Sequence, residues 1–151
     1  SLAAALKMCD VAIGAVRSNT GRSPCLVTEE MVMNMKQGSV IVDVSIDQGG
    51  CFETSEVTTL EHPTCIKHDI IHYGVPNIPS KVSRTASKTL SNIFSPILIN
   101  FGEQGSLVNV LRNFKGVRNG VYLYKGTLTS EPLGDAFDIQ HKNLNLLLGM
   151  F

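Results

Sequence analysis

The stretch GSVIVDVSIDQGGCFE, residues 38–53, decides the fold of this chain. Residues 39–46 are almost all apolar or small and rich in β-branched side chains, which predicts a strand buried on both faces. Such strands are typical of parallel sheets covered by helices. Asp47 comes directly after this strand, before Gly49 and Gly50, where the backbone can turn sharply. Because ligands of open α/β sheets bind beyond the carboxyl ends of the strands, Asp47 is the first candidate for a functional residue.

Two further apolar runs predict strands, one before and one after the strand at residues 39–46. They are residues 10–16 (DVAIGAV) and residues 69–75 (DIIHYGV). The three strands start near residues 10, 39 and 69, and this spacing of about 30 residues corresponds to one βα unit each. Residues 2–8 and 28–36 are expected to be helical, with Thr28 as an N-cap. Right-handed crossovers make the strands parallel, so Val16-Arg17, Asp47 and Asn77-Ile78 should meet at one edge of the sheet.

The pattern of apolar residues changes after Pro79. Residues 83–101 and 106–114 have the apolar spacing of helices, and residues 121–129 predict a small hairpin around Lys125-Gly126. Residues 49–63 lack a core-facing pattern and predict a loop or a short irregular helix. The pieces after Pro79 do not extend the sheet, and we expect them to belong with another domain.

The composition restricts the partners of this protein. Its 151 residues suffice for one ordinary domain, and its 13 basic and 13 acidic residues cancel, which gives no indication of a nucleic-acid or anionic-membrane partner. No apolar run approaches the ~20 residues of a membrane helix. The four cysteines form no CxxC pair, and no histidine has metal-ligand spacing, so we expect no metal site and a reducing, cytoplasmic location.

Several candidate residues also have plain structural interpretations. Asp47 could simply cap the turn that follows its strand, and Asn77, between Pro76 and Pro79, could simply end one. His72 in its apolar strand is interpreted as a core histidine. Cys51 has no adjacent base that would lower its pKa, so a buried structural thiol is favoured over a nucleophile.

Five segments of the chain resemble the second half of alanine dehydrogenase, a member of the alanine dehydrogenase/pyridine nucleotide transhydrogenase family. They are DVAIGAV, LVTEEMV, MKQGSVIVDVSIDQGGCFETS, TTLEHPT and HYGVPNIPSKVSRTAS. The resemblance runs from about residue 9 to residue 129 and is dense around IDQGGCFE. It implies an α/β fold: the second half of a Rossmann-like parallel sheet, followed by helices that return to a catalytic domain. Residues 1–80 would be the C-terminal half of the NAD-binding domain, and residues 81–151 the helical return segment with its small hairpin, part of the catalytic domain.

The implied activity is the oxidoreductase reaction of an NAD-dependent alanine dehydrogenase, in which L-alanine, NAD and water give pyruvate, ammonia and NADH. Family members typically assemble as hexamers, so a homo-oligomer with a small-molecule substrate is expected. Asp47 matches the family's active-site aspartate. The positions that match cofactor contacts are Val16, Arg17, Val44, Ser45, Ile46, Asp47, Val75, Pro76, Asn77 and Ile78. Some members carry a cofactor-contacting arginine where Glu56 stands, so that contact is not carried over.

The family's catalytic histidine, its substrate-carboxylate lysine and arginine, and its glycine-rich pyrophosphate turn belong to the first half, and no GxGxxG occurs in this chain. We therefore expect a C-terminal fragment that begins partway through a domain and is inactive alone. Two alternatives stay open: the nucleotide-binding α subunit of a pyridine nucleotide transhydrogenase, and a non-catalytic interaction module.

Overall fold

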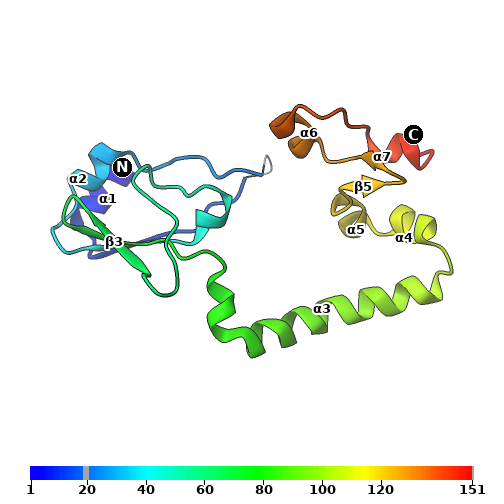
Figure 1. Ribbon diagram of the computed structural model, residues 1–151, viewed down its shortest axis with the longest axis horizontal. Helices are drawn as coiled ribbons and strands as arrows, with labels where there is room; N and C mark the ends of the chain where they lie inside the picture. Colours follow the sequence, from blue (N-terminus) through cyan, green and yellow to red (C-terminus); the bar gives the residue numbers. More distant parts are fainter. Residues whose placement is uncertain (19–20, 151) are drawn as a thin grey trace. The chain divides into compact units, whose positions relative to one another are not determined.

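The computed structural model describes residues 1–18 and 21–150 (Figure 1). Its contacts divide the chain into two compact units, Ser1–Lys81 and Val82–Phe151. The first unit contains a four-stranded sheet, and the second consists of helices and a two-stranded hairpin. The assignment of residues 1–80 and 81–151 to two domains of a larger enzyme stays a prediction.

The sheet of the first unit has the order β1-β2-β4-β3, with β1 at Val11–Gly14, β2 at Val40–Asp43, β3 at Thr64–Lys67 and β4 at Ile70–Tyr73. β1 and β4 both pair with β2 in parallel. This confirms the three parallel strands predicted from the 30-residue spacing, although each is shorter than its apolar run. The carboxyl ends of β1, β2 and β4 consequently lie at one edge of the sheet.

The strand β3 was not predicted, and it pairs antiparallel with β4 at the edge of the sheet. The two strands are joined by His68 and Asp69, which both have a positive φ, of 53° and 60°. This is the backbone of a tight hairpin turn, which usually carries asparagine, aspartate or glycine at both positions. Because His68 is none of these and no glycine follows Asp69, the hairpin left only a weak signal in the sequence.

Two short helices precede the strands that they help to cover: α1 at Leu2–Met8, as predicted, and α2 at Glu29–Met33. The Thr28 side chain accepts a hydrogen bond from the backbone N–H of Met31, which confirms its expected role as an N-cap. The α2 helix ends before Lys36, three residues earlier than expected, and Gly38 turns the chain into β2 with a φ of 77°.

Among the described residues of this unit, the core lies on one face of the sheet. Leu6 of α1 and Val32 of α2 pack there with Ile41 and Ile70 of the sheet. On the other face, Val11, Ile13 and Ile66 are 53%, 68% and 70% exposed. The prediction that residues 39–46 form a strand buried on both faces is therefore wrong for this structure: Ile41 is buried, but Val40 and Val42 on the opposite face are half-buried. The reason is that α1 and α2 both pack on the same side.

His72 of β4 is buried, as predicted, and both of its ring nitrogens have partners. Nδ1 lies 3.0 Å from the carbonyl oxygen of Ile70, and Nε2 lies 2.8 Å from Thr54 Oγ1. Since a carbonyl only accepts, Nδ1 carries the proton and Nε2 accepts from the threonine hydroxyl. Burial lowers the pKa of His72 below its ordinary value of 6.5, and the positive charges of Lys67 and His68 act in the same direction.

This arrangement predicts a loss of stability in mild acid. The unfolded chain takes up a proton at His72 near pH 6.5, whereas the folded chain resists protonation until a lower pH. The contribution of His72 is thus fully present above pH 6.5 and decreases as the pH falls below that value. We expect urea denaturation between pH 7.5 and 5 to show this slope, and His72→Gln to flatten it. The exposed His62, replaced in the same way, is the control: if His62→Gln flattens the slope equally, the assignment to His72 is wrong.

The second unit begins with the helix α3 at Ser83–Glu103, which extends the predicted 83–101 by two residues. The helix α4 at Leu107–Asn113 and the hairpin of β5, Leu123–Tyr124, with β6, Thr127–Leu128, were also predicted, and Lys125 and Gly126 form the turn. The helices α5 at Lys115–Asn119, α6 at Glu131–Phe137 and α7 at Leu144–Leu147 were not predicted. Leu144 and Leu148 pack with Leu111 in a small core.

None of the helices in the described ranges combines the length and the hydropathy needed to cross a membrane.

Candidate functional site

The segment after β2 is a 3-10 helix, η1, at Val44–Gln48. The expectation that the strand continues to residue 46 is therefore wrong, and Val44, Ser45 and Ile46 lie in η1 instead of the sheet. The physical reason is Asp43, the last residue of β2, whose side chain accepts a hydrogen bond from the backbone N–H of Ser45 and so begins a helical turn. Gly49 ends η1 with a φ of 99°, a left-handed conformation that glycine adopts without strain.

Asp47 of η1 meets the segment that follows β4. The backbone N–H of Asn77 donates to both carboxylate oxygens of Asp47, at 3.0 Å to Oδ1 and 3.2 Å to Oδ2. Asn77 has a φ of 52°, which asparagine tolerates better than most residues. This contact confirms that the ends of β2 and β4 come together at one edge of the sheet. It also shows that the main chain of Asn77, directly after Pro76, holds the carboxylate in place.

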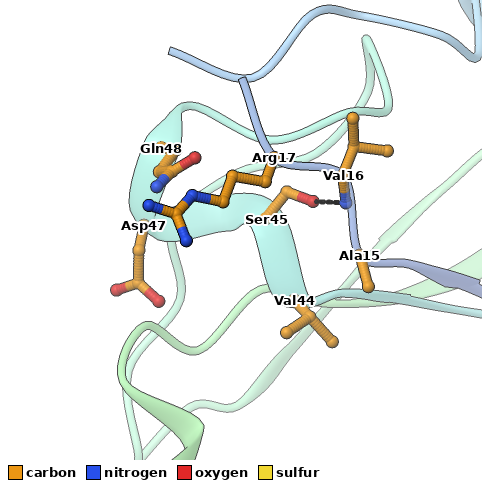
Figure 2. Close-up of a pocket in the computed structure, with 7 residues that line it drawn as sticks. All are labelled: Ala15, Val16, Arg17, Val44, Ser45, Asp47 and Gln48. Atoms are coloured by element: carbon orange, nitrogen blue, oxygen red, sulfur yellow. Dashed lines mark hydrogen bonds between the residues drawn. The ribbon is translucent and has the colours of Figure 1, made fainter. Parts of the chain in front are cut away.

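A cleft of about 270 Å³ opens beside η1 at the same edge of the sheet. Figure 2 shows the Arg17 side chain extending across η1 towards Asp47 and Gln48. The lining residues come from the segment after β1 and from η1: Ala15, Val16, Arg17, Val44, Ser45, Asp47 and Gln48. Five of these are among the predicted site residues, whereas Ala15 and Gln48 are not.

The other predicted site residues do not line this cleft. Ile46 and Val75 are buried, at 5% and 2% exposure, so little of either residue is accessible to a ligand in this structure. Asn77 is exposed, and Pro76 and Ile78 are half-buried. The roles of all ten residues in cofactor binding stay predictions.

The charged and polar groups of the cleft are largely available to a ligand. Arg17 and Asp47 are exposed, and within residues 1–18 and 21–150 neither takes part in a salt bridge. Gln48 Oε1 is buried and finds no hydrogen-bond donor in this part of the chain. A buried acceptor without a donor is costly, and a bound hydroxyl or amide would satisfy it. In the same ranges, no group of three His, Cys, Asp or Glu side chains could hold a metal ion.

The two walls of the cleft are joined by hydrogen bonds between the segment after β1 and η1. The Ser45 hydroxyl accepts from the backbone N–H of Val16 at 2.7 Å (Figure 2). Ser23 connects the same elements, since its hydroxyl donates to the Val16 carbonyl at 3.0 Å and its N–H donates to the Gln48 carbonyl at 2.8 Å. Ser45 is itself buried, so its hydroxyl fixes the shape of the cleft rather than presenting a free polar group.

Two titratable groups close to the site in sequence have structural roles. Burial raises the pKa of the Cys51 thiol, and the Asp43 carboxylate adds to this effect, which agrees with the predicted structural thiol. The Glu56 carboxylate pairs with Lys67 at 2.6 Å, and the hydrogen bond from Lys67 lowers the pKa of Glu56. The charge of Glu56 is therefore balanced within the sheet region, and Glu56 does not line the cleft.

Gln48 and Asp43 are the candidate residues that the sequence analysis missed. Gln48 is adjacent to Asp47, but a single glutamine carries no recognisable spacing. Asp43 had a clearer signal, because it is the one charged residue within the apolar run 39–46. A carboxylate inside a buried strand requires partners, and the sequence alone could have raised that question.

Three parallel strands with a cleft beyond their carboxyl ends are typical of the Rossmann-like class of α/β domains. The family model "Alanine dehydrogenase/PNT, C-terminal domain" matches residues 1–131. The chain therefore belongs to the alanine dehydrogenase/PNT C-terminal domain family.

Relatives and solved structures agree with this assignment. The chain is 39% identical over 140 residues to alanine dehydrogenase 2 of Staphylococcus aureus strains USA300 and NCTC 8325 / PS 47, a match that covers 92% of this chain and 37% of each relative. It thus spans little more than a third of the length of the curated relatives it matches.

A solved L-alanine dehydrogenase superposes with a TM-score of 0.77 at 35% identity, covering 92% of this chain and 38% of that structure. A transhydrogenase from Sinorhizobium meliloti superposes less closely, with a TM-score of 0.51 at 28% identity over 57% of this chain and 24% of that structure.

Proposed function

We propose that this chain supplies one wall of the active site of an NAD-dependent alanine dehydrogenase, which converts L-alanine, NAD and water to pyruvate, ammonia and NADH. The observation that carries the proposal is the Asp47 carboxylate, which is held by the Asn77 N–H beside a cleft at the carboxyl edge of the sheet. The names of the relatives, matched over 92% of this chain, supply the substrate.

The residues of the cleft fit part of a dinucleotide. Arg17 offers a cation for a phosphate or a hydrogen bond to a sugar hydroxyl, and Gln48 Oε1 offers a buried acceptor. A volume of about 270 Å³ lies just below the usual range of small-molecule sites, so the rest of a dinucleotide would lie against other residues. When bound, NAD supplies the nicotinamide that accepts the hydride.

Asp47 is suited to two tasks in this reaction. Oxidation of an amine at Cα develops positive charge, which a carboxylate stabilises, and the subsequent attack of water requires a proton acceptor. The backbone N–H of Asn77, shared between both carboxylate oxygens, restricts the rotation of the carboxylate and so keeps it in one orientation. The neighbouring Arg17 makes no salt bridge with it in the described ranges, so the charge of Asp47 is not neutralised there.

The transhydrogenase alternative has weaker support, because that structure matches only 57% of this chain, against 92% for the alanine dehydrogenase. The alternative of a non-catalytic interaction module would leave the residues of the cleft without a function.

The four cysteines are free thiols in the structure, in keeping with the proposed reducing, cytoplasmic location.

A chimera tests the proposed function directly. In it, this chain replaces the matching segment of the Staphylococcus aureus alanine dehydrogenase 2. We expect the chimera to reduce NAD in the presence of L-alanine, followed by NADH absorbance, and the 151-residue chain alone to show no enzyme-like rate.

Two outcomes would contradict the proposal. A well-folded chimera that does not reduce NAD in the presence of L-alanine would refute the proposed function, and glycine or L-serine in place of L-alanine serves as the substrate control. Rapid NADH formation by the 151-residue chain alone would refute the expectation that it needs the other half of the enzyme.

A further inference from the structure

Asp43 is a buried carboxylate that holds two separate stretches of backbone. It is 1% exposed at the end of β2. Its Oδ1 accepts from the Ser45 N–H at 3.0 Å, and its Oδ2 accepts from the N–H groups of Cys51 at 2.9 Å and Phe52 at 3.4 Å. No salt bridge among the described residues includes Asp43, so backbone dipoles stabilise its charge.

These hydrogen bonds continue to the cleft. Ser45, which donates to Asp43, accepts in turn from the Val16 N–H at 2.7 Å, so the wall from β1 is connected to Asp43 through a single residue. Cys51 and Phe52, which follow η1 in the sequence, bond to the other carboxylate oxygen of Asp43. Gly50 passes so close that an added Cβ would lie 2.8 Å from Asp43 Oδ2. The carboxylate therefore fixes both ends of the turn that carries Asp47.

We propose that Asp43 is a positioning residue of the cleft: it touches no ligand, but it sets the orientation of η1 and thereby the contact of Asp47 with Asn77. This inference rests on the proposed function for its catalytic consequence, although its structural part can be tested without any activity. The alternative is that Asp43 stabilises the unit as a whole, with no particular effect at the cleft.

The first test is amide hydrogen exchange, measured by NMR on the 151-residue chain. In Asp43→Asn, the side-chain nitrogen cannot accept a hydrogen bond, so one of the two stretches of backbone loses its partner. We expect exchange about tenfold faster at the Val16 and Asn77 amides, which do not contact Asp43. The Ile71 amide, bonded to the Ser39 carbonyl at 2.9 Å in the sheet, is the internal reference and should not change.

Thr54→Val is the matched control. Thr54 is also buried, and its hydroxyl bonds His72 on the sheet rather than the walls of the cleft. This variant should leave exchange at Val16 and Asn77 unchanged. If Asp43→Asn accelerates the Ile71 amide as much as the other two, Asp43 merely stabilises the unit. If it accelerates none of the three, Asp43 holds nothing at the cleft. Either result overturns the proposal.

The second test is a double-mutant cycle in the chimera. If Asp43 acts through Asp47, Asp43→Asn should lower kcat about tenfold in the parent but have no further effect in the Asp47→Ala background. Additive losses would show that Asp43 acts independently of Asp47 and would contradict the proposal. An inactive parent chimera would count against the proposed function alone, because the exchange experiment still decides the role of Asp43.

Discussion

Replacing Asp47 by alanine in the chimera is expected to lower kcat for L-alanine oxidation by about 10²–10⁴-fold, the usual contribution of a positioned acid–base group. The effect on the KM for L-alanine should be smaller, because the carboxylate interacts with charge that develops during the reaction. Asp47 is exposed and bonded to one backbone amide, so its removal should cost little folding stability. Steady-state kinetics and a thermal unfolding curve on the same preparations would separate the two effects.

A second substitution distinguishes the charge of Asp47 from its structural contact. Asp47→Asn can still accept a hydrogen bond from the Asn77 N–H through its carbonyl oxygen, but it carries no charge and is no base. We expect kcat to fall nearly as far as in Asp47→Ala. Asp69→Asn, in the turn between β3 and β4, makes the same chemical change away from the cleft and should leave kcat unaltered. Full activity in Asp47→Asn would mean that Asp47 only shapes the turn.

Gly74→Ala should strongly destabilise the first unit, with a loss of roughly 3 kcal/mol. An added Cβ at Gly74 would lie 2.1 Å from the carbonyl oxygen of Glu56, a backbone atom that cannot rotate away. Gly74 is also held on both sides by Thr58, which donates its N–H to the Gly74 carbonyl and accepts from the Gly74 N–H. The chain must therefore move apart at the point where β4 leads into Val75–Asn77.

Hydrogen exchange in β2 and β4 measures this loss within the first unit itself. Since 1.4 kcal/mol is a factor of ten, protection should fall on the order of a hundredfold. Gly102→Ala in α3 is the control, because nothing lies within 4 Å of its added Cβ and alanine favours a helix. Unchanged protection in Gly74→Ala would show that the loop of Glu56 yields easily, and the packing argument would then be wrong.

The parallel part of the sheet could be predicted because β-branched runs and their spacing are local properties of the sequence. The runs at residues 10–16, 39–46 and 69–75 all contain strands, but each strand has only four residues. The difference at β2 has a definite cause, since the Asp43 side chain captures the Ser45 N–H and ends the strand. Hydrogen bonds between a side chain and the backbone compete with a sheet in a way that hydropathy does not reveal.

The candidate site was predictable to the extent that topology determines it. Arg17, Asp47 and Asn77 each follow a parallel strand, so their meeting at one edge required no knowledge of side-chain positions. Which residues actually line the cleft depends on η1, whose 3-10 turn buries Ile46 and presents Val44 and Gln48 instead. The likeness to alanine dehydrogenase supplied the proposed substrate, which no pattern in the strands could have indicated.

The face of the sheet that α1 and α2 leave uncovered affects how this chain behaves at high concentration. β1 is an edge strand in the described sheet, and Ile13 and Val11 project from it with more than half of their surface in water. Strand edges of this kind recruit one another into aggregates as the concentration rises. Ile13→Lys would introduce a charge that hinders this association and would leave the packed face of the sheet intact. This variant is therefore suited to the preparation of concentrated samples.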